Sequence, residues 1–143
     1  NDLAFISAVI IGIQKELADR IIKNKGSSLA IFLAAAGQSQ LIRVVSRRNY
    51  YPLPEVDTSW LFWKRQNKAI NLESFQLILK GAFWGKRKNL GNSLRKNPFF
   101  HIRPQWLDKL NNDCSQIADL LSLRADALEL SQFLRIENFL YES

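Results

Sequence analysis

The first third of the chain passes from an unbroken apolar run to a helical pattern of apolar and polar positions. Residues Ala8 to Ile13 read AVIIGI, a largely β-branched run that predicts a strand buried on both faces, as in parallel sheets. From Gln14 to Lys25 the apolar residues recur at helical spacing, and Gly26 follows as a helix-ending residue. We therefore expect a strand followed at once by an amphipathic helix.

A second helix and a second strand are predicted directly afterwards. Ser27 or Ser28 can cap a helix that runs through Ala36. Gly37 ends this helix, and the β-branched run from Leu41 to Val45 predicts a second strand. A strand, two helices and a strand together predict a βαβ crossover within a mainly parallel sheet.

A proline-rich loop separates this unit from a third apolar run. Residues Arg47 to Glu55 read RRNYYPLPE, in which Pro52 and Pro54 remove backbone donors and favour extended geometry before them. Residues Val56 to Trp63 (VDTSWLFW) predict a third strand. Because the connection is too short for a helical crossover, this strand should lie antiparallel to a neighbour.

The pattern becomes helical throughout after the polar stretch Lys64 to Asn71. Apolar residues from Leu72 to Phe83 share one helical face. Further helices are expected at Asn89–Lys96, Pro104–Leu110, Ser115–Leu123 and Leu130–Tyr141. The expected fold class is therefore α/β for residues 1–68, followed by a small all-α domain at residues 69–143.

Positive charge is concentrated in one part of the helical half. The chain has 20 Lys and Arg against 13 Asp and Glu, a net charge of +7. All of this excess lies between residues 80 and 103, which contain no acidic residue, so the rest of the chain is neutral. The cations are Lys80, Lys86, Arg87, Lys88, Arg95, Lys96 and Arg103. Such a stretch favours a polyanionic partner, such as nucleic acid or a membrane surface, over a merely solvated face.

The remaining composition excludes several kinds of site. Cys114 and His101 are the only residues of their types, so neither an internal disulfide nor a thiol or multi-histidine metal site can form. No phosphate-binding GxGxxG or GxxxxGK sequence is present. The apolar runs are too short to span a membrane. We expect a reducing, cytoplasmic setting, no secretory leader, and neither a membrane nor a metal as partner.

The proline-rich loop is the first candidate binding site. Two tyrosines stand beside a stiff Pro-x-Pro sequence, which would hold their rings in place before a ligand arrives. A held ring suits stacking on an extruded base, and the two arginines before it suit a phosphate. The alternative is that the tyrosines cover the edge of the sheet. The candidate residues are Arg47, Arg48, Tyr50, Tyr51, Pro52 and Pro54.

The basic stretch is the second candidate. Lys86, Arg87 and Lys88 are consecutive at the start of an expected helix, where cations oppose the helix dipole. Because the three cannot all face the core, we expect phosphate contacts here, together with Arg95 and Lys96. The alternative is a solvated basic turn. No pair of carboxylates and no Ser/His/Asp or Cys/His set is arranged for catalysis, so no catalytic residue is assigned.

Four stretches, taken in order, resemble the ribosomal RNA adenine dimethyltransferase family, the KsgA-type enzymes. They are IQKELADRI (Ile13–Ile21), YYPLPEVDTS (Tyr50–Ser59), AFWGKRKNLGNSL (Ala82–Leu94) and RADALELSQFL (Arg124–Leu134). The resemblance covers nearly the whole chain. It departs from the family mildly at Tyr50, where Phe is more usual, and at Lys86, where Arg is common.

The resemblance implies an enzyme that transfers methyl groups from S-adenosylmethionine to adenines of small-subunit ribosomal RNA. This RNA, or the pre-30S particle, would be its partner. In that family the aromatic residue at the position of Tyr50 packs against the target adenine, and the basic segment lies near the RNA backbone. The family's cofactor loop and catalytic motif lie upstream of the segments matched here.

We therefore interpret the chain as the C-terminal half of such an enzyme. Residues 1–68 would supply the last three strands and helices of a Rossmann-like methyltransferase core, and residues 69–143 a helical RNA-engaging domain. The chain starts at Asn1 and contains no Met, which favours a piece of a longer protein that would be monomeric at full length. Alone it should bind S-adenosylmethionine poorly, should not methylate, and should expose an aggregation-prone sheet edge. One alternative is a non-catalytic nucleic-acid-binding module of the same family, such as a transcription or ribosome-assembly factor. Another is a domain that binds an acidic protein.

Overall fold

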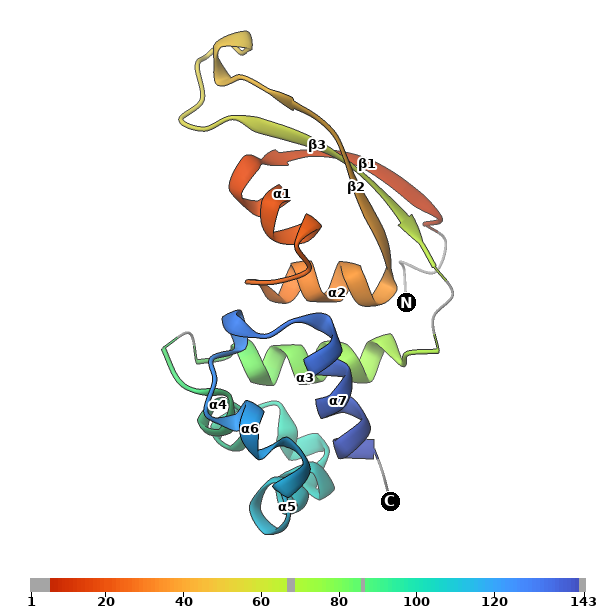
Figure 1. Cartoon of the computed structure of the whole chain (residues 1–143), viewed down its shortest axis with the longest axis vertical. Coiled ribbons are helices and arrows are strands. Elements are labelled where there is room, and N and C mark those ends of the chain that lie inside the picture. Colours follow the sequence, from red (N-terminus) through yellow and green to blue (C-terminus); the bar gives the residue numbers. More distant parts are fainter. Residues whose placement is uncertain (1–5, 67–68, 86, 142–143) are drawn as a thin grey trace.

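The computed structural model describes residues 6–66, 69–85 and 87–141. A curved sheet with helices against it forms one end of the molecule, the sheet part (residues 6–66), and a cluster of helices forms the other, the helical part (residues 69–141) (Figure 1). Helices α2 (Ser28–Ala36) and α3 (Leu72–Phe83) lie against each other where the two parts meet (Figure 1).

Capping and turn residues set the ends of the helices in the sheet part. Its elements are β1 (Ala8–Gln14), α1 (Lys15–Ile22), α2, β2 (Gly37–Val45) and β3 (Thr58–Arg65), with a 3₁₀ turn at Arg47–Asn49. Ser27 caps α2 by accepting a hydrogen bond from Ala30 N at 3.1 Å, as predicted. Helix α1 ends sooner than predicted, and the chain then turns through Asn24 and Gly26, whose φ angles are 52° and 82°.

The strands form an antiparallel sheet, so the mainly parallel sheet predicted from the element order is wrong. In the described residues the strand order is β1-β3-β2, and β3 runs antiparallel to both neighbours. β1 and β2 therefore point the same way, as in a βαβ crossover, but β3 is inserted between them. The prediction that the third strand lies antiparallel to a neighbour is confirmed.

Among the described residues, helices cover one face of the sheet. Ile11, Ile13 and Leu61 pack against α1 and α2, and Leu61 is 1% exposed. The opposite face carries Ile10 and Trp60, which are 57% and 38% exposed. The prediction that β1 is buried on both faces is therefore wrong here, because exposure alternates residue by residue along the strand.

Gly37 lets β2 and β3 approach closely at the point where α2 ends. A Cβ atom at this position would lie 2.3 Å from Lys64 O and 2.7 Å from the Trp63 ring. The same ring donates from Nε1 to Leu33 O at 3.1 Å, which ties β3 to α2. Gly37 thus follows the last residue of α2, as predicted, and is also the first residue of β2, which begins earlier than Leu41.

The helical part follows the predicted series with some elements split. It contains α3, α4 (Leu90–Lys96), α5 (Pro104–Asn112), α6 (Ala118–Leu121) and α7 (Leu130–Tyr141), with 3₁₀ turns at Phe100–Ile102, Ser115–Ile117 and Ala125–Ala127. Asn89 caps α4 through its side-chain oxygen, and Pro104 occupies the first turn of α5. The single helix predicted from Ser115 to Leu123 instead begins as a 3₁₀ turn and continues as α6.

An aromatic cluster fills the core of the helical part. Phe75, Phe100 and Phe133 are fully buried, and Trp106 is 1% exposed. The Phe100 and Trp106 rings meet edge to face with their centroids 5.1 Å apart. Ile31 of α2 belongs to the same apolar cluster, so this core continues into the sheet part.

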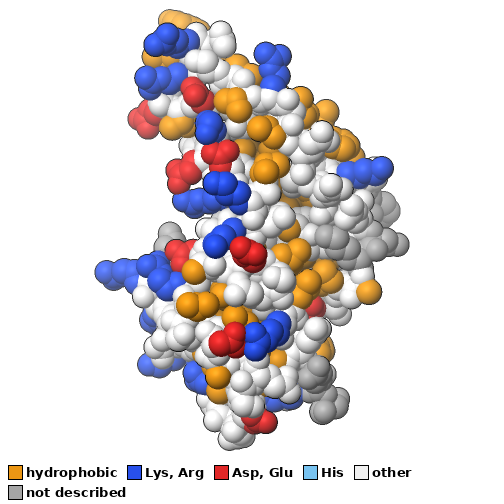
Figure 2. Space-filling model, viewed as in Figure 1, with side chains coloured by type: hydrophobic (Ala, Val, Ile, Leu, Met, Phe, Trp, Pro, Cys, Tyr) orange, Lys and Arg blue, Asp and Glu red, His pale blue; other side chains and the backbone are white. Residues whose placement is uncertain are grey.

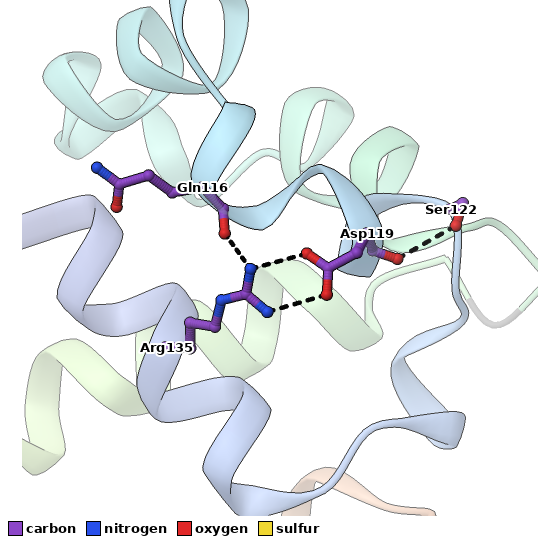
Figure 3. A network of polar contacts seen from close by, with 4 residues as sticks. All are labelled: Gln116, Asp119, Ser122 and Arg135. Carbon is purple, nitrogen blue, oxygen red and sulfur yellow. Dashed lines mark hydrogen bonds and ion pairs between the residues drawn. The ribbon is translucent and has the colours of Figure 1, made fainter.

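A surface network ties α6 to α7 (Figure 3). Both Asp119 carboxylate oxygens accept hydrogen bonds of 2.9 Å from the Arg135 guanidinium, which also donates to Gln116 O. Hydrogen bonding by Arg135 holds the pKa of Asp119 below its usual value. Both side chains are about half exposed, so this is a surface ion pair with good geometry.

The Asp119–Arg135 pair should stabilise the protein at neutral pH and lose this effect in acid. The folded pKa of Asp119 lies below the unfolded value of about 4, so the stabilisation is present above that value and falls as the pH drops through the folded pKa. Asp119→Asn should therefore unfold at a lower urea concentration than wild type at about pH 7, and the difference should shrink at about pH 3. Asp108→Asn, which changes an exposed carboxyl on α5, is the control. A difference of equal size at both pH values would contradict the ion pair.

Candidate nucleic-acid interface

The connection from β2 to β3 projects beyond the sheet and is closed at its base (Figure 1). Arg47 N donates to Asp57 Oδ1 at 2.9 Å, and Arg47 Nη1 donates to Glu55 O at 3.0 Å. The Asp57 carbonyl oxygen accepts from Lys15 N at 3.0 Å, so the same residue joins the loop to the start of α1. These hydrogen bonds form a neck, which leaves the loop tip (residues 50–54) projecting beyond it.

The loop tip presents aromatic and apolar side chains to solvent. Tyr51 is fully exposed, Leu53 is 62% exposed and Tyr50 is 36% exposed. Pro52 is exposed and Pro54 is half-buried. Tyr51 therefore does not cover the sheet edge, and its ring is available for stacking.

The two arginines before the loop tip have different surroundings. The Arg47 guanidinium is engaged at the neck by its hydrogen bond to Glu55 O. Arg48 has an exposed side chain, while its backbone N donates to Ser46 Oγ at 3.4 Å. Arg47 thus braces the loop, whereas the Arg48 side chain is exposed.

The turn between α3 and α4 carries the basic residues Arg87 and Lys88, both exposed, and is called the basic turn below. Lys88 Nζ lies 4.1 Å from the centroid of the Trp84 ring, which is a cation–π contact. Lys86 lies outside the described residues. Helix α4 begins at Leu90, one residue after the predicted start at Asn89, so Arg87 and Lys88 directly precede its N-cap.

The two basic residues at the end of α4 also differ. Arg95 Nε and Nη2 donate to Leu110 O at 3.2 and 2.7 Å, and Nη2 lies 3.6 Å from Cys114 Sγ. Arg95 thereby satisfies a carbonyl in the last turn of α5 and ties α4 to α5. Lys96 is exposed.

The loop tip and the basic turn are separate surfaces. The loop tip lies at the far end of the sheet part, and the basic turn lies beside the junction with the helical part (Figure 1). Two further arginines, Arg20 and Arg124, line a hollow together with Lys88. Neither arginine was predicted from the sequence, because no local pattern connects residues so far apart along the chain.

A charged hollow of about 410 Å³ lies between the neck of the loop and the start of α1. Two of its carboxylates are engaged: Asp19 pairs with Lys15 at 3.1 Å, and Asp57 accepts a hydrogen bond from Arg47 N. Within the described residues, no group of three His, Cys, Asp or Glu side chains is placed to hold a metal ion. No helix in the described ranges is long and apolar enough to cross a membrane.

Comparison with known proteins adds a family match. A family model described as Ribosomal RNA adenine dimethylase matches residues 2–140. Proteins named Ribosomal RNA small subunit methyltransferase A from Mycoplasma mobile and Fusobacterium nucleatum are 28% and 27% identical over 73% and 92% of this chain. The matches cover 49% and 50% of those proteins, so the chain spans about half the length of the curated relatives it matches.

Solved structures share the fold. A dimethyladenosine transferase from Plasmodium falciparum matches with a TM-score of 0.67 and 21% identity, over 93% of this chain and 56% of that chain. The 23S rRNA methyltransferase ErmE matches with a TM-score of 0.63 and 20% identity, over 97% of this chain and 57% of that chain. The sheet part and the helical part together therefore have the fold of one portion of these proteins.

Proposed function

Because the chain belongs to the ribosomal RNA adenine dimethylase family, we propose that it holds ribosomal RNA for methylation of adenine. In this proposal it is part of an S-adenosylmethionine-dependent enzyme that acts on small-subunit ribosomal RNA. The loop tip stacks on the target base. Four exposed cations contact the RNA backbone: Arg48, Arg87, Lys88 and Lys96.

A fully exposed tyrosine on a braced loop is the observation that carries this proposal. Tyr51 exposes its whole ring, while hydrogen bonds from Arg47 and Lys15 close the neck below it. A loop that is already ordered loses little conformational entropy when it binds, so more of the stacking free energy remains as affinity. Tyr50, the position to which the family resemblance points, is adjacent and partly exposed. We therefore include both rings in the proposed base-stacking surface.

We propose that S-adenosylmethionine, the methyl donor implied by the family resemblance, is bound mainly by residues other than those described. The chain has six glycines, which are dispersed along it, and the chain contains no glycine-rich phosphate-binding sequence. In the charged hollow beside the loop neck, Asp19 pairs with Lys15 and Asp57 accepts a hydrogen bond from Arg47 N. We therefore assign the methyl donor to no residue of this chain, whose proposed role is to bind and orient the RNA.

The basic turn provides the test of this proposal. We expect the double variant Arg87→Gln/Lys88→Gln to bind a small-subunit ribosomal RNA fragment more weakly and with a shallower salt dependence. Losing two phosphate contacts should reduce the slope of log Kobs against log[salt] by about 1.4–1.8. Fluorescence anisotropy of the labelled RNA across a salt series measures both quantities.

A matched control removes two positive charges from a surface away from the basic turn. Arg43 and Lys64 are exposed and lie on the face of the sheet opposite α1 and α2. Arg43→Gln/Lys64→Gln should leave the slope near that of wild type. If the Arg87/Lys88 variant keeps the wild-type slope, or if the control variant loses as much, the basic turn does not contact the RNA backbone and this part of the proposal fails.

A further inference from the structure

Asp57 lies at the point where β1 and β2 end and β3 begins. It directly precedes Thr58, the first residue of β3, whose register partners are Gln14 at the end of β1 and Val45 at the end of β2. Figure 2 shows basic and acidic side chains next to one another in the upper part of the molecule, over the loop neck and the start of α1. A group at this position can contact both the loop and α1.

The Asp57 side chain caps the 3₁₀ turn that leads into the loop tip. Arg47 N, at the first position of this turn, donates to Asp57 Oδ1 at 2.9 Å. Because the first N–H groups of a helical turn have no partner within it, an acceptor outside the turn must satisfy them. Tyr50 N in turn donates to Arg47 O at 3.2 Å. The carboxylate therefore holds the turn to which the backbone of Tyr50 is bonded.

The Asp57 main chain makes a similar contact with α1. Lys15 is the first residue of this helix, and its N–H donates to Asp57 O at 3.0 Å. The N-cap residue, Gln14, makes no side-chain capping hydrogen bond. Asp57 O thus supplies a hydrogen bond that the residue at the helix start does not provide. Two acceptors of one residue therefore join the start of α1 to the loop.

Arg47 carries this attachment to both sides of the loop tip. Its carbonyl oxygen accepts from the N–H of Tyr50, the first residue of the tip. Its guanidinium donates from Nη1 to Glu55 O at 3.0 Å, and Glu55 directly follows Pro54, the last residue of the tip. The hydrogen bond from Arg47 N to Asp57 therefore anchors a residue that contacts the chain before and after the tip.

We propose that Asp57 is the positioning residue of the loop tip. It holds Tyr50 and Tyr51 at a fixed place relative to the start of α1 and contacts no base itself. This role rests on the proposed function, in which the two rings stack on the target base. Where only a fraction of the molecules has the binding-competent loop, the apparent Kd is the intrinsic Kd divided by that fraction. Losing the carboxylate should therefore weaken stacking although both rings remain.

The test compares an adenine-containing single-stranded RNA with the same RNA carrying an abasic site in place of the adenine. Asp57→Ala should lower the ratio of the two affinities about 2- to 10-fold, the effect of losing one hydrogen bond. Asp57→Asn keeps an oxygen that can accept from Arg47 N, so it should retain most of the wild-type ratio. Asp108→Ala removes an exposed carboxyl on α5 and should leave the ratio unchanged.

A double-mutant cycle shows whether Asp57 acts through the rings. In the Tyr50→Ala/Tyr51→Ala background, Asp57→Ala should not change the ratio further. Amide ¹⁵N relaxation gives a second readout, in which the order parameters of Tyr50 and Tyr51 should fall in Asp57→Ala and stay near wild type in Asp57→Asn. Arg47→Ala leaves Asp57 and α1 in place, removes the contact with Glu55 O, and should also lower the ratio.

The outcomes separate this role from the proposed function. A wild-type ratio in both Asp57→Ala and Arg47→Ala, with a lowered ratio in Tyr50→Ala/Tyr51→Ala, would overturn the positioning role and leave base stacking by the loop tip standing. A wild-type ratio in all three variants would overturn both. An effect of Asp57→Ala that persists in full without the two tyrosines, or an equal effect of Asp57→Asn, would also overturn the positioning role.

Discussion

Replacing both Tyr50 and Tyr51 with Ala should weaken binding of an adenine-containing single-stranded RNA by about 5- to 150-fold, the effect of losing one stacked base. The loop neck is closed by hydrogen bonds of Arg47 and Asp57, which the substitutions do not touch. Tyr51 is fully exposed, so its removal takes away contact surface without opening a cavity. Anisotropy titrations of a labelled RNA give the affinity, and the two single variants apportion the loss between the rings.

Several controls separate stacking from a general effect on the loop. Leu53→Ala shortens another exposed apolar side chain of the loop tip and should have little effect. Tyr50→Phe/Tyr51→Phe keeps both rings and should retain most of the affinity. An RNA in which the adenine is replaced by an abasic site should bind the wild type and the double Ala variant equally. Equal affinities of wild type and the double Ala variant for the intact RNA would rule out the stacking role.

Helix starts could be predicted from the sequence because capping is a local interaction. Ser27 and Asn89 accept hydrogen bonds from backbone groups three residues on, and Pro104 needs only its own fixed φ to begin α5. The last helix, α7, has the predicted bounds because its apolar residues keep helical spacing throughout. Each of these signals lies within a few residues of the boundary that it sets.

Strand order could not be predicted in the same way, because pairing joins residues far apart in the chain. β1 and β2 follow one another with two helices between them, which is the usual order of neighbouring parallel strands. The third strand takes the central place, pairing Leu61 with Ile11 on one side and with Leu41 on the other. The unbroken apolar run of β1 likewise indicated burial on both faces, yet Ile10 is 57% exposed.

The sequence predicted which residue types form the candidate site, but it could not predict what surrounds each side chain. A sequence shows that arginines are present but not whether their guanidinium groups are already hydrogen-bonded. Arg47 and Arg95 donate to backbone carbonyls, whereas Arg48 has an exposed side chain. Arg20 and Arg124 meet at one hollow only because the sheet part packs on the helical part. Such juxtapositions arise from tertiary structure, which no local spacing encodes.

Trp106→Ala should lower the free energy of unfolding by about 3–5 kcal/mol, the usual cost of removing a buried tryptophan side chain. The ring is 1% exposed and meets Phe100 and Tyr141 edge to face, with centroid separations of 5.1 and 5.5 Å. Its loss therefore removes apolar burial and two aromatic contacts together. Because a domain is typically stable by only about 5–15 kcal/mol, the variant should unfold at a much lower urea concentration. Circular dichroism across a urea series measures the shift.

The matched control is Trp84→Ala, which removes a tryptophan that is 43% exposed and should change stability far less.

A urea titration also tests whether the sheet part and the helical part unfold together. Ile31 and Ala35 of α2 pack in the core that contains Trp106, so losing that core should unfold the sheet part as well. A variant with Trp84→Phe and Trp106→Phe leaves Trp60 and Trp63 of β3 as the fluorescent tryptophans. In a urea titration of this variant, its helical circular dichroism and its tryptophan fluorescence should change in one transition. Two separate transitions would instead mean that residues 1–68 and 69–143 unfold as independent domains despite the shared core.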